Sequence, residues 1–201
     1  SKLINVNIKS QFPIFTNKPD LLYLDSASST QKPEYVIQKT NEYISKSYAN
    51  LWRGAYLLAD ESDYYYYGCK EKIAQLIYCS AQELFFSYNA TYCINNFAYS
   101  IAEAGYLSSW KNIILSIIEH HANILVRQKL ATQFNCTIIR IGLTENYELD
   151  IEQLKKINHS NTAVISLSLC SNVLWIKNNL NTIRSIVWDA CIFCIDASQA
   201  I

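Results

Sequence analysis

The segment Asn112–Glu119, NIILSIIE, is an almost continuous apolar run that ends at the polar pair His120-His121. Ile and Leu without polar alternation are typical of a strand buried on both faces, as in a parallel sheet covered by helices. The residues that follow, Ala122–Phe134, have the length and composition of a helix. We therefore expect a strand at 112–119 and a helix at 122–134, which is the unit from which α/β folds are built.

The alternation of strand and helix continues on both sides of this segment. Apolar runs predict further strands at 83–88, 136–141, 163–170 and 191–195. Helical patterns indicate helices at 91–104 with Gly105 as the C-cap, at 149–157 and at 180–188. The first eighty residues differ, because they predict two long helices, at 34–47 and 62–78. The sequence thus predicts one α/β domain over 1–201, mainly helical in 1–80 and alternating in 81–201, around a mostly parallel sheet.

Composition excludes several classes of function. The 17 Lys and Arg balance the 17 Asp and Glu, so no basic excess favours binding to nucleic acid or to an anionic membrane. No apolar run approaches the length of a membrane span, and the first residues lack the apolar core of a signal peptide. The seven scattered cysteines are expected to be reduced and mostly buried. We expect a soluble protein of the cytoplasm or of an organelle matrix.

Polar residues follow the predicted strands at the edge where parallel strands bind ligands. His120 follows the strand at 112–119, Asn172 follows that at 163–170, and Asp196 follows that at 191–195, with Gln199 three residues further on. Thr91 begins the helix after the first predicted strand. A parallel sheet would bring an imidazole, an amide, a carboxylate and a helix N-terminus into one crevice.

These groups together suit pyridoxal 5′-phosphate. A helix N-terminus with a hydroxyl favours a phosphate, a carboxylate at the end of a buried strand needs a partner such as a protonated pyridine nitrogen, and an imidazole can lie against a ring. Each residue alone also has a structural explanation: Thr91 as a cap, and Asn172 and Asp196 as turn residues. Zinc is a weaker alternative, because EHHAN at 119–123 is not a zinc-binding HExxH motif. The CxxC at 191–194 also has no second Cys or His pair.

Four segments carry a resemblance to a known family. YLDSASSTQKP (23–33), IEHHANI (118–124), SNVL (171–174) and DASQA (196–200) resemble, in order and spacing, the SufS/CsdA-type cysteine desulfurases. These are class-V aminotransferase-like enzymes of fold-type I, and the resemblance covers nearly the whole chain as their N-terminal portion. It implies a three-layer large domain of the pyridoxal-phosphate transferase type, incomplete at its C-terminus.

The resemblance also implies roles for individual residues. His120 would stack on the cofactor ring and assist proton transfer, and Asp196 would keep the pyridine nitrogen protonated. Gln199 would hydrogen-bond the phenolic oxygen of the cofactor, and Thr91 would contribute to the phosphate site. Asn172 would lie near that phenolic oxygen and near the carboxylate of the substrate. No metal site is expected.

The reaction implied by the resemblance removes sulfur from L-cysteine, leaving alanine and a persulfide on an enzyme cysteine. A homodimer and a sulfur-acceptor protein of iron–sulfur cluster assembly are the expected partners. The family's cofactor-binding lysine and its persulfide cysteine would both fall beyond Ile201, so the chain as given is not expected to complete the reaction. Two alternatives stay open: a selenocysteine lyase or another class-V enzyme, and a non-catalytic remnant that at most binds a partner.

Four stretches depart from the family pattern. Asn89-Ala90-Thr91 stands where the family has Gly-Thr-Thr, and Trp175 and Ala197 stand where it has glycine. The segment Trp52–Tyr56, WRGAY, replaces the usual HRGxH and lacks both histidines. These changes bear on cofactor affinity and on substrate handling rather than on the fold.

Overall fold

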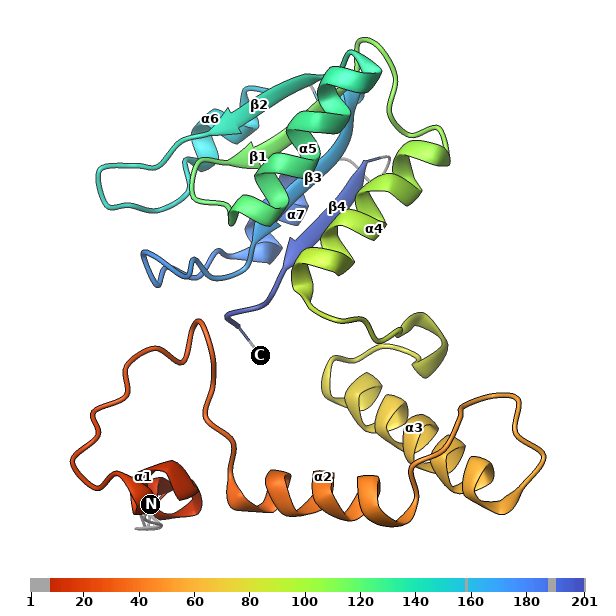
Figure 1. Ribbon diagram of the computed structural model, residues 1–201. Coiled ribbons are helices and arrows are strands. Elements are labelled where there is room, and N and C mark those ends of the chain that lie inside the picture. Colours follow the sequence, from red (N-terminus) through yellow and green to blue (C-terminus); the bar gives the residue numbers. More distant parts are fainter. Residues whose placement is uncertain (1–7, 158, 188–190, 201) are drawn as a thin grey trace. The chain divides into compact units, whose positions relative to one another are not determined.

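The computed structural model describes residues 8–157, 159–187 and 191–200 (Figure 1). The chain divides into two compact units, residues 1–86 and 87–201. The second unit contains the sheet and every residue proposed above for the site.

The second unit is built on a parallel four-stranded sheet in the order β2-β1-β3-β4. Its strands, drawn as arrows in Figure 1, are β1 (Asn112–Ser116), β2 (Thr137–Ile141), β3 (Thr162–Ser168) and β4 (Ile192–Asp196). This confirms the predicted parallel sheet. The carboxyl ends of all four strands therefore lie at the same end of the sheet, where β3 lies between β1 and β4.

Burial differs sharply between the centre and the edges of the sheet. Every residue of β3 is buried, whereas every residue of β4 is only half-buried. The sequence predicted a fully buried strand at 191–195. The difference arises because β4 is an edge strand, which pairs with β3 alone among the described residues.

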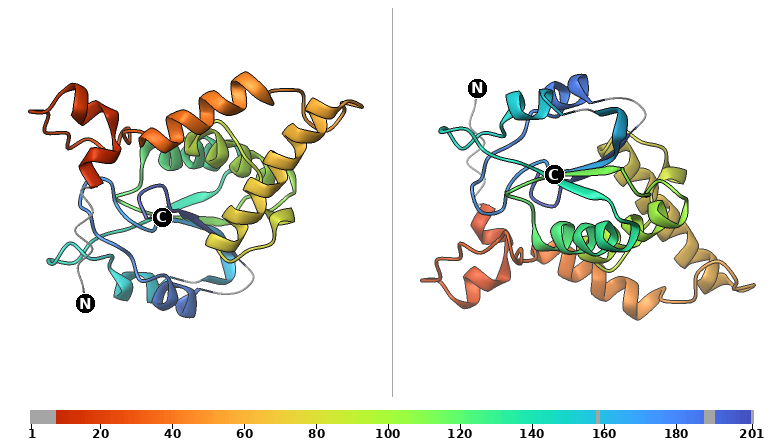
Figure 2. Two further views of the ribbon diagram at one scale, coloured as in Figure 1. Left: turned by 90° about the horizontal axis from the view of Figure 1, so that it is seen from below. Right: turned by 90° about the horizontal axis from the view of Figure 1, so that it is seen from above.

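Helices cover both faces of the sheet and make it the middle of three layers, as Figure 2 shows. One face packs against α4 (Ala90–Glu103) and α5 (His121–Phe134), in a core that includes Ala98, Ile113 and Leu130. The other face packs against α6 (Ile151–Lys155) and α7 (Leu180–Ile186), in a core that includes Ile114 and Ile165. A short 3-10 helix, η3 (His159–Asn161), precedes β3. Successive strand residues alternate between the two faces, so one sheet serves two cores.

Several boundaries differ from those predicted. β1 stops at Ser116 rather than at residue 119, because the Ser116 hydroxyl accepts the backbone N–H of Ile118 at 3.3 Å and the chain turns there. α6 is shorter than 149–157, because Leu149 forms an antiparallel bridge with Leu143 and Asp150 caps the helix. The predicted end of α7 at Trp188 lies outside the described residues.

The strand predicted at 83–88 is wrong. A 3-10 helix, η2 (Ala81–Glu83), occupies its first position, and residues 84–88 form no strand. The aromatic residues that suggested a strand are exposed, with Phe85 59% and Tyr88 89% accessible. A strand needs a neighbour to pair its backbone groups, and no described residue supplies one.

The described residues of the first unit form helices and connecting segments. The unit comprises η1 (Ile8–Gln11), α1 (Pro13–Asn17), α2 (Glu34–Lys46) and α3 (Leu57–Leu76), followed by η2. α3 begins at Leu57 rather than at Ser62. Ser62 lies inside the helix, where its buried hydroxyl donates to the Ser47 carbonyl at 2.7 Å and accepts from the Ala49 N–H at 3.0 Å. One serine therefore anchors the α2–α3 connection to α3.

Candidate active site

β1, β3 and β4 are parallel, so their carboxyl ends lie at one end of the sheet (Figure 1), and three of the predicted residues end or follow these strands. The register pairs Ser168, the last residue of β3, with Asp196, the last residue of β4. His120 and Asn172 follow β1 and β3 by four residues each, since those strands end at Ser116 and Ser168. The observed topology thus brings the ends of these strands together, and the convergence of imidazole, amide and carboxylate stays a prediction.

His120 is the N-cap of α5. Its Nδ1 accepts a hydrogen bond from the backbone N–H of Ala122 at 3.2 Å, and the side chain is otherwise exposed. A neutral imidazole that accepts at Nδ1 carries its proton on Nε2. The cap therefore fixes the orientation of the ring and leaves Nε2 as the nitrogen that can exchange a proton with a ligand.

Asp196 ends β4 with one carboxylate oxygen in use. Its Oδ1 accepts from the backbone N–H of Ser198 at 3.0 Å and from the Ser198 hydroxyl at 2.5 Å. No hydrogen bond among the described residues uses Oδ2. The side chain is half-buried, so a cationic donor placed there would meet an oriented and partly desolvated carboxylate.

Asn172 lies in the loop that follows β3. The buried Ser171 shapes this loop, because its hydroxyl accepts the N–H groups of Val173 at 3.3 Å and Leu174 at 3.2 Å. The Asn172 side chain is exposed, and so is that of Gln199 in the turn after β4. Both amides are accessible to a ligand at this edge.

Thr91 lies in the first turn of α4, whose N-terminus is directed toward the edge at which β4 ends (Figure 1). Asn89 caps the helix by accepting the Tyr92 N–H at 2.9 Å. The N–H groups of Ala90 and Thr91 have no acceptor among the described hydrogen bonds. Free N–H groups at the start of a 14-residue helix favour an anion. The structure therefore has a helix N-terminus at Thr91, although it lacks the strand predicted before it.

Sequence reasoning missed a buried polar cluster beside His120. Glu119 is 6% exposed, and its carboxylate accepts hydrogen bonds from the Ser116 hydroxyl, from Asn123 Nδ2 at 3.0 Å and from the Ser168 hydroxyl at 2.8 Å. Ser166 donates to Asn123 Oδ1 at 2.8 Å. The signal was present in the sequence as two serines, two residues apart, in the otherwise apolar β3, because such residues share one face.

A second unpredicted feature is the buried Arg127 of α5. It is fully inaccessible, its Nη2 lies 3.7 Å from the Cys194 sulfur, and its Nε and Nη1 have no hydrogen-bond partner in the described structure. Burial lowers the pKa of the Arg127 guanidinium, and the neighbouring Cys194 opposes that shift. Helical spacing alone did not reveal that this arginine faces the sheet.

The cysteines are all free, as expected, but they are less buried than expected. Only Cys191 is buried, Cys69 is exposed and the other five are half-buried. The described residues contain no group of three His, Cys, Asp or Glu side chains that could hold a metal ion. No helix in the described part of the chain has the length and apolarity needed to cross a membrane.

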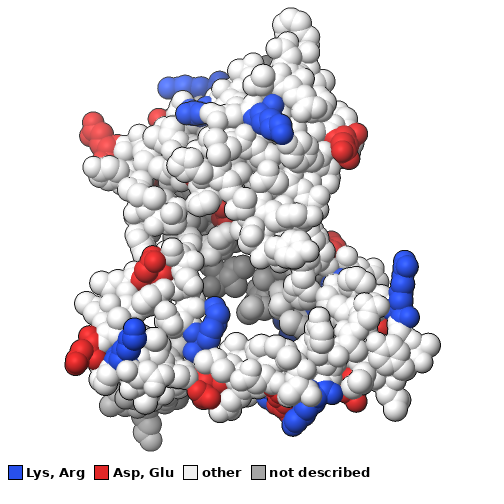
Figure 3. Space-filling view, in the orientation of Figure 1, with Lys and Arg blue, Asp and Glu red and all other residues white. Residues whose placement is uncertain are grey.

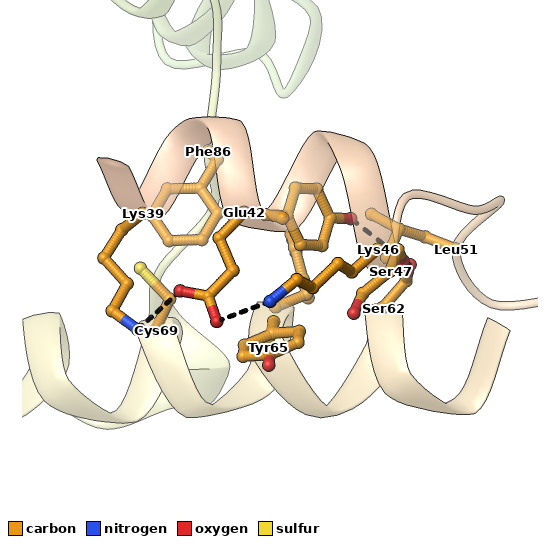
Figure 4. A pocket seen from close by; sticks show the side chains of 11 residues that line it. Lys39, Glu42, Lys46, Ser47, Leu51, Ser62, Tyr65, Cys69 and Phe86 are labelled. Atoms are coloured by element: carbon orange, nitrogen blue, oxygen red, sulfur yellow. Dashed lines mark hydrogen bonds and ion pairs between the residues drawn. The ribbon is translucent and has the colours of Figure 1, made fainter. Parts of the chain in front are cut away.

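The first unit contains a separate cavity of about 390 Å³ between α2 and α3 (Figure 4). Tyr43, Tyr65 and Phe86 give it apolar walls, and Glu42 at its rim pairs with Lys39 at 2.7 Å and with Lys46 at 3.6 Å. None of the predicted site residues lines it. On the face drawn in Figure 3, acidic and basic side chains are scattered and form no patch of one sign.

The chain is similar in sequence to known proteins. Residues 22–201 match the family model described as Aminotransferase class-V. The chain is 33% identical over 202 residues to a probable cysteine desulfurase of Streptomyces coelicolor, covering 96% of this chain and 48% of that protein. It is 32% identical to the cysteine desulfurase SufS of Plasmodium falciparum, covering 96% of this chain and 36% of that protein. The chain thus spans about half or less of the length of these relatives.

Solved structures share the fold. A cysteine desulfurase of Thermococcus onnurineus superposes with a TM-score of 0.90 at 24% identity, covering 100% of this chain and 49% of that one. The cysteine desulfurase CsdA of Escherichia coli gives a TM-score of 0.82 at 26% identity, covering 95% and 48%. A third structure, with a TM-score of 0.75, is of a mutant that has glycine covalently linked to its PLP cofactor.

Proposed function

Because the chain belongs to the class-V aminotransferase family, we propose that it is the N-terminal portion of a pyridoxal-phosphate-dependent cysteine desulfurase. The proposed reaction takes L-cysteine and an enzyme thiol and yields alanine and an enzyme persulfide, which is the sulfur donor for iron–sulfur cluster assembly. The observation that carries the proposal is the register of β1, β3 and β4. It pairs Asp196, whose Oδ2 accepts no hydrogen bond from a described residue, with Ser168 at the end of β3, four residues before Asn172. β1, which ends four residues before His120, pairs with the other side of β3.

The donor set at this edge fits pyridoxal phosphate. The free N–H groups of Ala90 and Thr91 would hold the phosphate, and Asp196 Oδ2 would accept from the protonated pyridine nitrogen. His120 would lie against the ring, and Gln199 would bind the phenolic oxygen. When bound, the cofactor supplies an electron sink that stabilises negative charge on the substrate.

Three side chains of this chain would have roles in the reaction. Asp196 holds a proton at the pyridine nitrogen, because a carboxylate favours the cationic form of its partner. His120 would donate its Nε2 proton and take it back, since its Nδ1 accepts the Ala122 N–H and the neutral ring therefore carries its proton on Nε2. Asn172 orients the carboxylate of L-cysteine through its exposed amide.

Asp196→Asn tests the proposal directly. The variant keeps an oxygen for the two Ser198 donors but replaces Oδ2 with an NH₂ group, which cannot accept from the pyridine nitrogen. Titration of pyridoxal phosphate, followed by absorbance, is expected to show saturable binding to the parent chain. The variant should bind at least about tenfold more weakly, which is the loss expected for one charge-assisted hydrogen bond.

The exposed Asp60 of α3 provides the matched control, since Asp60→Asn makes the same chemical change far along the sequence from the site. It should leave the affinity for pyridoxal phosphate unchanged. Equal affinity in the parent and in Asp196→Asn would overturn the proposed role of Asp196. Absence of binding in a chain extended through the expected lysine and cysteine would favour the non-catalytic alternative. A preference for selenocysteine in the complete gene product would favour the lyase.

We further propose that the protein forms a homodimer and that a sulfur-acceptor protein is a separate partner. We place both in the cytoplasm or in an organelle matrix. The name of the Plasmodium relative, SufS, supports the link to sulfur transfer. The seven free cysteines are consistent with a reducing compartment. Sedimentation of the gene product, and its localisation by a fluorescent tag, would test these points.

A further inference from the structure

The carboxylate of Glu119 is buried without a cation. It is 6% exposed, and none of the ion pairs between described residues includes it. Glutamate is almost never buried unless it is paired. Here three neutral donors replace the cation: two hydroxyls and one amide. Such an arrangement is costly to assemble, because every donor must be directed at the same two oxygen atoms.

The three donors come from three elements that meet at the candidate site. Ser116 is the last residue of β1, Asn123 lies in the first turn of α5, and Ser168 is the last residue of β3. Glu119 itself lies in the turn between β1 and α5, directly before His120. Its carboxylate therefore ties this turn to the neighbouring strand as well as to both of its own flanking elements.

The cluster continues from Ser168 toward the other site residues. Ser168 is paired in register with Asp196 on β4. Its carbonyl accepts from Nδ2 of the buried Asn178 at 2.7 Å, and the Asn178 N–H donates to the Leu169 carbonyl at 2.8 Å. Asn178 thus closes the loop after β3, which contains Asn172. Hydrogen bonds through Ser168 therefore connect the turn that contains His120 to the loop that contains Asn172. The pairing of Ser168 with Asp196 connects the same turn to the end of β4.

We propose that Glu119 is a positioning residue for the cofactor site. Its carboxylate holds the turn that carries His120 against the end of β3, and so sets the imidazole relative to Asn172 and Asp196. This proposal deepens the proposed function and rests on it. Glu119 touches neither substrate nor cofactor in this role; it acts through the placement of His120.

The test compares Glu119→Gln with the parent chain by NMR of the histidine rings. The chain has three histidines, His120, His121 and His159, so each ring signal can be assigned by substitution. Gln has the shape of Glu but lacks the charge and one acceptor oxygen, so it cannot accept from all three donors as the carboxylate does. The His120 ring signal should shift and broaden, that of His159 should stay in place, and the dissociation constant for pyridoxal phosphate should rise about tenfold.

A second variant and a control separate positioning from general stability. Ser168→Ala removes the one described side-chain hydrogen bond between Glu119 and β3, and should change the His120 signal in the same direction. Gln153→Glu disturbs a different polar anchor, which accepts the Gly142 N–H at 2.7 Å and donates to the Arg140 carbonyl at 3.2 Å. It should lower the melting temperature without moving the His120 signal.

The outcomes distinguish the two proposals. An unchanged His120 signal in both Glu119→Gln and Ser168→Ala, together with a lower melting temperature, would show a purely structural role and overturn the inference. Failure of the chain extended through the expected lysine to bind pyridoxal phosphate would contradict the proposed function. The NMR comparison would then still report whether Glu119 fixes the turn of His120.

Discussion

Trp175 has a left-handed backbone conformation, with φ of 58°. A non-glycine residue there brings its Cβ close to the following carbonyl oxygen. The indole gives little in return, because the residue is 73% exposed. The turn is held instead by the Trp175 N–H, which donates to the Ser171 carbonyl at 3.0 Å. The backbone at 175 thus suits glycine, the residue that the family resemblance places there.

Trp175→Gly is therefore expected to stabilise the second unit. Relief of the left-handed strain is worth about 1–2 kcal/mol, and the extra freedom of glycine in the unfolded chain costs about 0.5–1 kcal/mol. A net gain of roughly 0.5–1 kcal/mol in the free energy of unfolding should appear in urea denaturation. Val173→Gly is the matched control, since Val173 lies in the same turn, is 74% exposed and has no positive φ. It should destabilise; a loss of stability in both variants would contradict the prediction.

Individual side chains show where sequence reasoning stops. His120, Asn172 and Asp196 were chosen because each follows an apolar run in the sequence, and such a run indicates a strand. The cap formed by His120 Nδ1 could not, since it depends on the turn angle between β1 and α5. Glu119 appeared to belong to the strand itself, and only the early end of β1 at Ser116 reveals that it turns inward.

A buried positive charge lies between α5 and β4, and neither of these elements supplies a negative charge to neutralise it. Arg127 of α5 is fully buried and lies 3.7 Å from the sulfur of Cys194 on β4. Two of its three nitrogens have no partner in the described structure. A guanidinium held in this way loses its hydration without regaining equivalent hydrogen bonds.

Arg127→Met should accordingly leave the free energy of unfolding unchanged or raise it by about 1–4 kcal/mol, the range seen when buried ionic groups are replaced by apolar residues of similar volume. Cys194 tolerates the change, because a thiol behaves as a small apolar group. Arg140→Met on β2 removes an exposed arginine and should alter stability by no more than about 0.5 kcal/mol. Thermal and urea unfolding provide the measurement. A clear loss of stability in Arg127→Met alone would show that the guanidinium has a stabilising partner.

Strands were predicted correctly where burial determines the structure, and wrongly where the structure depends on pairing with another strand. β3 combines a continuous apolar pattern with complete burial, and it was predicted to within two residues at each end. The segment 83–88 has a similar composition but no partner strand among the described residues, so it remains irregular. Composition indicates that a segment can form a strand, whereas pairing depends on distant parts of the chain.

The buried hydrophobic residues are unevenly distributed between the two units. Both hydrophobic clusters lie entirely within residues 87–201. In the described part of the first unit, the buried residues are few and small: Ser47, Ala59, Ser62 and Ala74. Large aromatic residues there are exposed instead, for example Tyr35, Tyr48, Trp52 and Tyr64. Little apolar area is therefore withdrawn from water in the first unit, and burial of such area is the main source of stability.

Amide hydrogen exchange should resolve this difference. The backbone amides of α2 and α3 are expected to exchange at least about a hundredfold faster than those of β1 and β3, because local stability follows the density of buried apolar contacts. α5 is the internal control, since it is a helix of the second unit with five buried residues, and it should be protected like the strands. Slow exchange throughout α2 and α3 would mean that the exposed tyrosines are covered in solution, as they would be by self-association. Dilution would distinguish that case, because protection that comes from self-association decreases when the protein concentration is lowered.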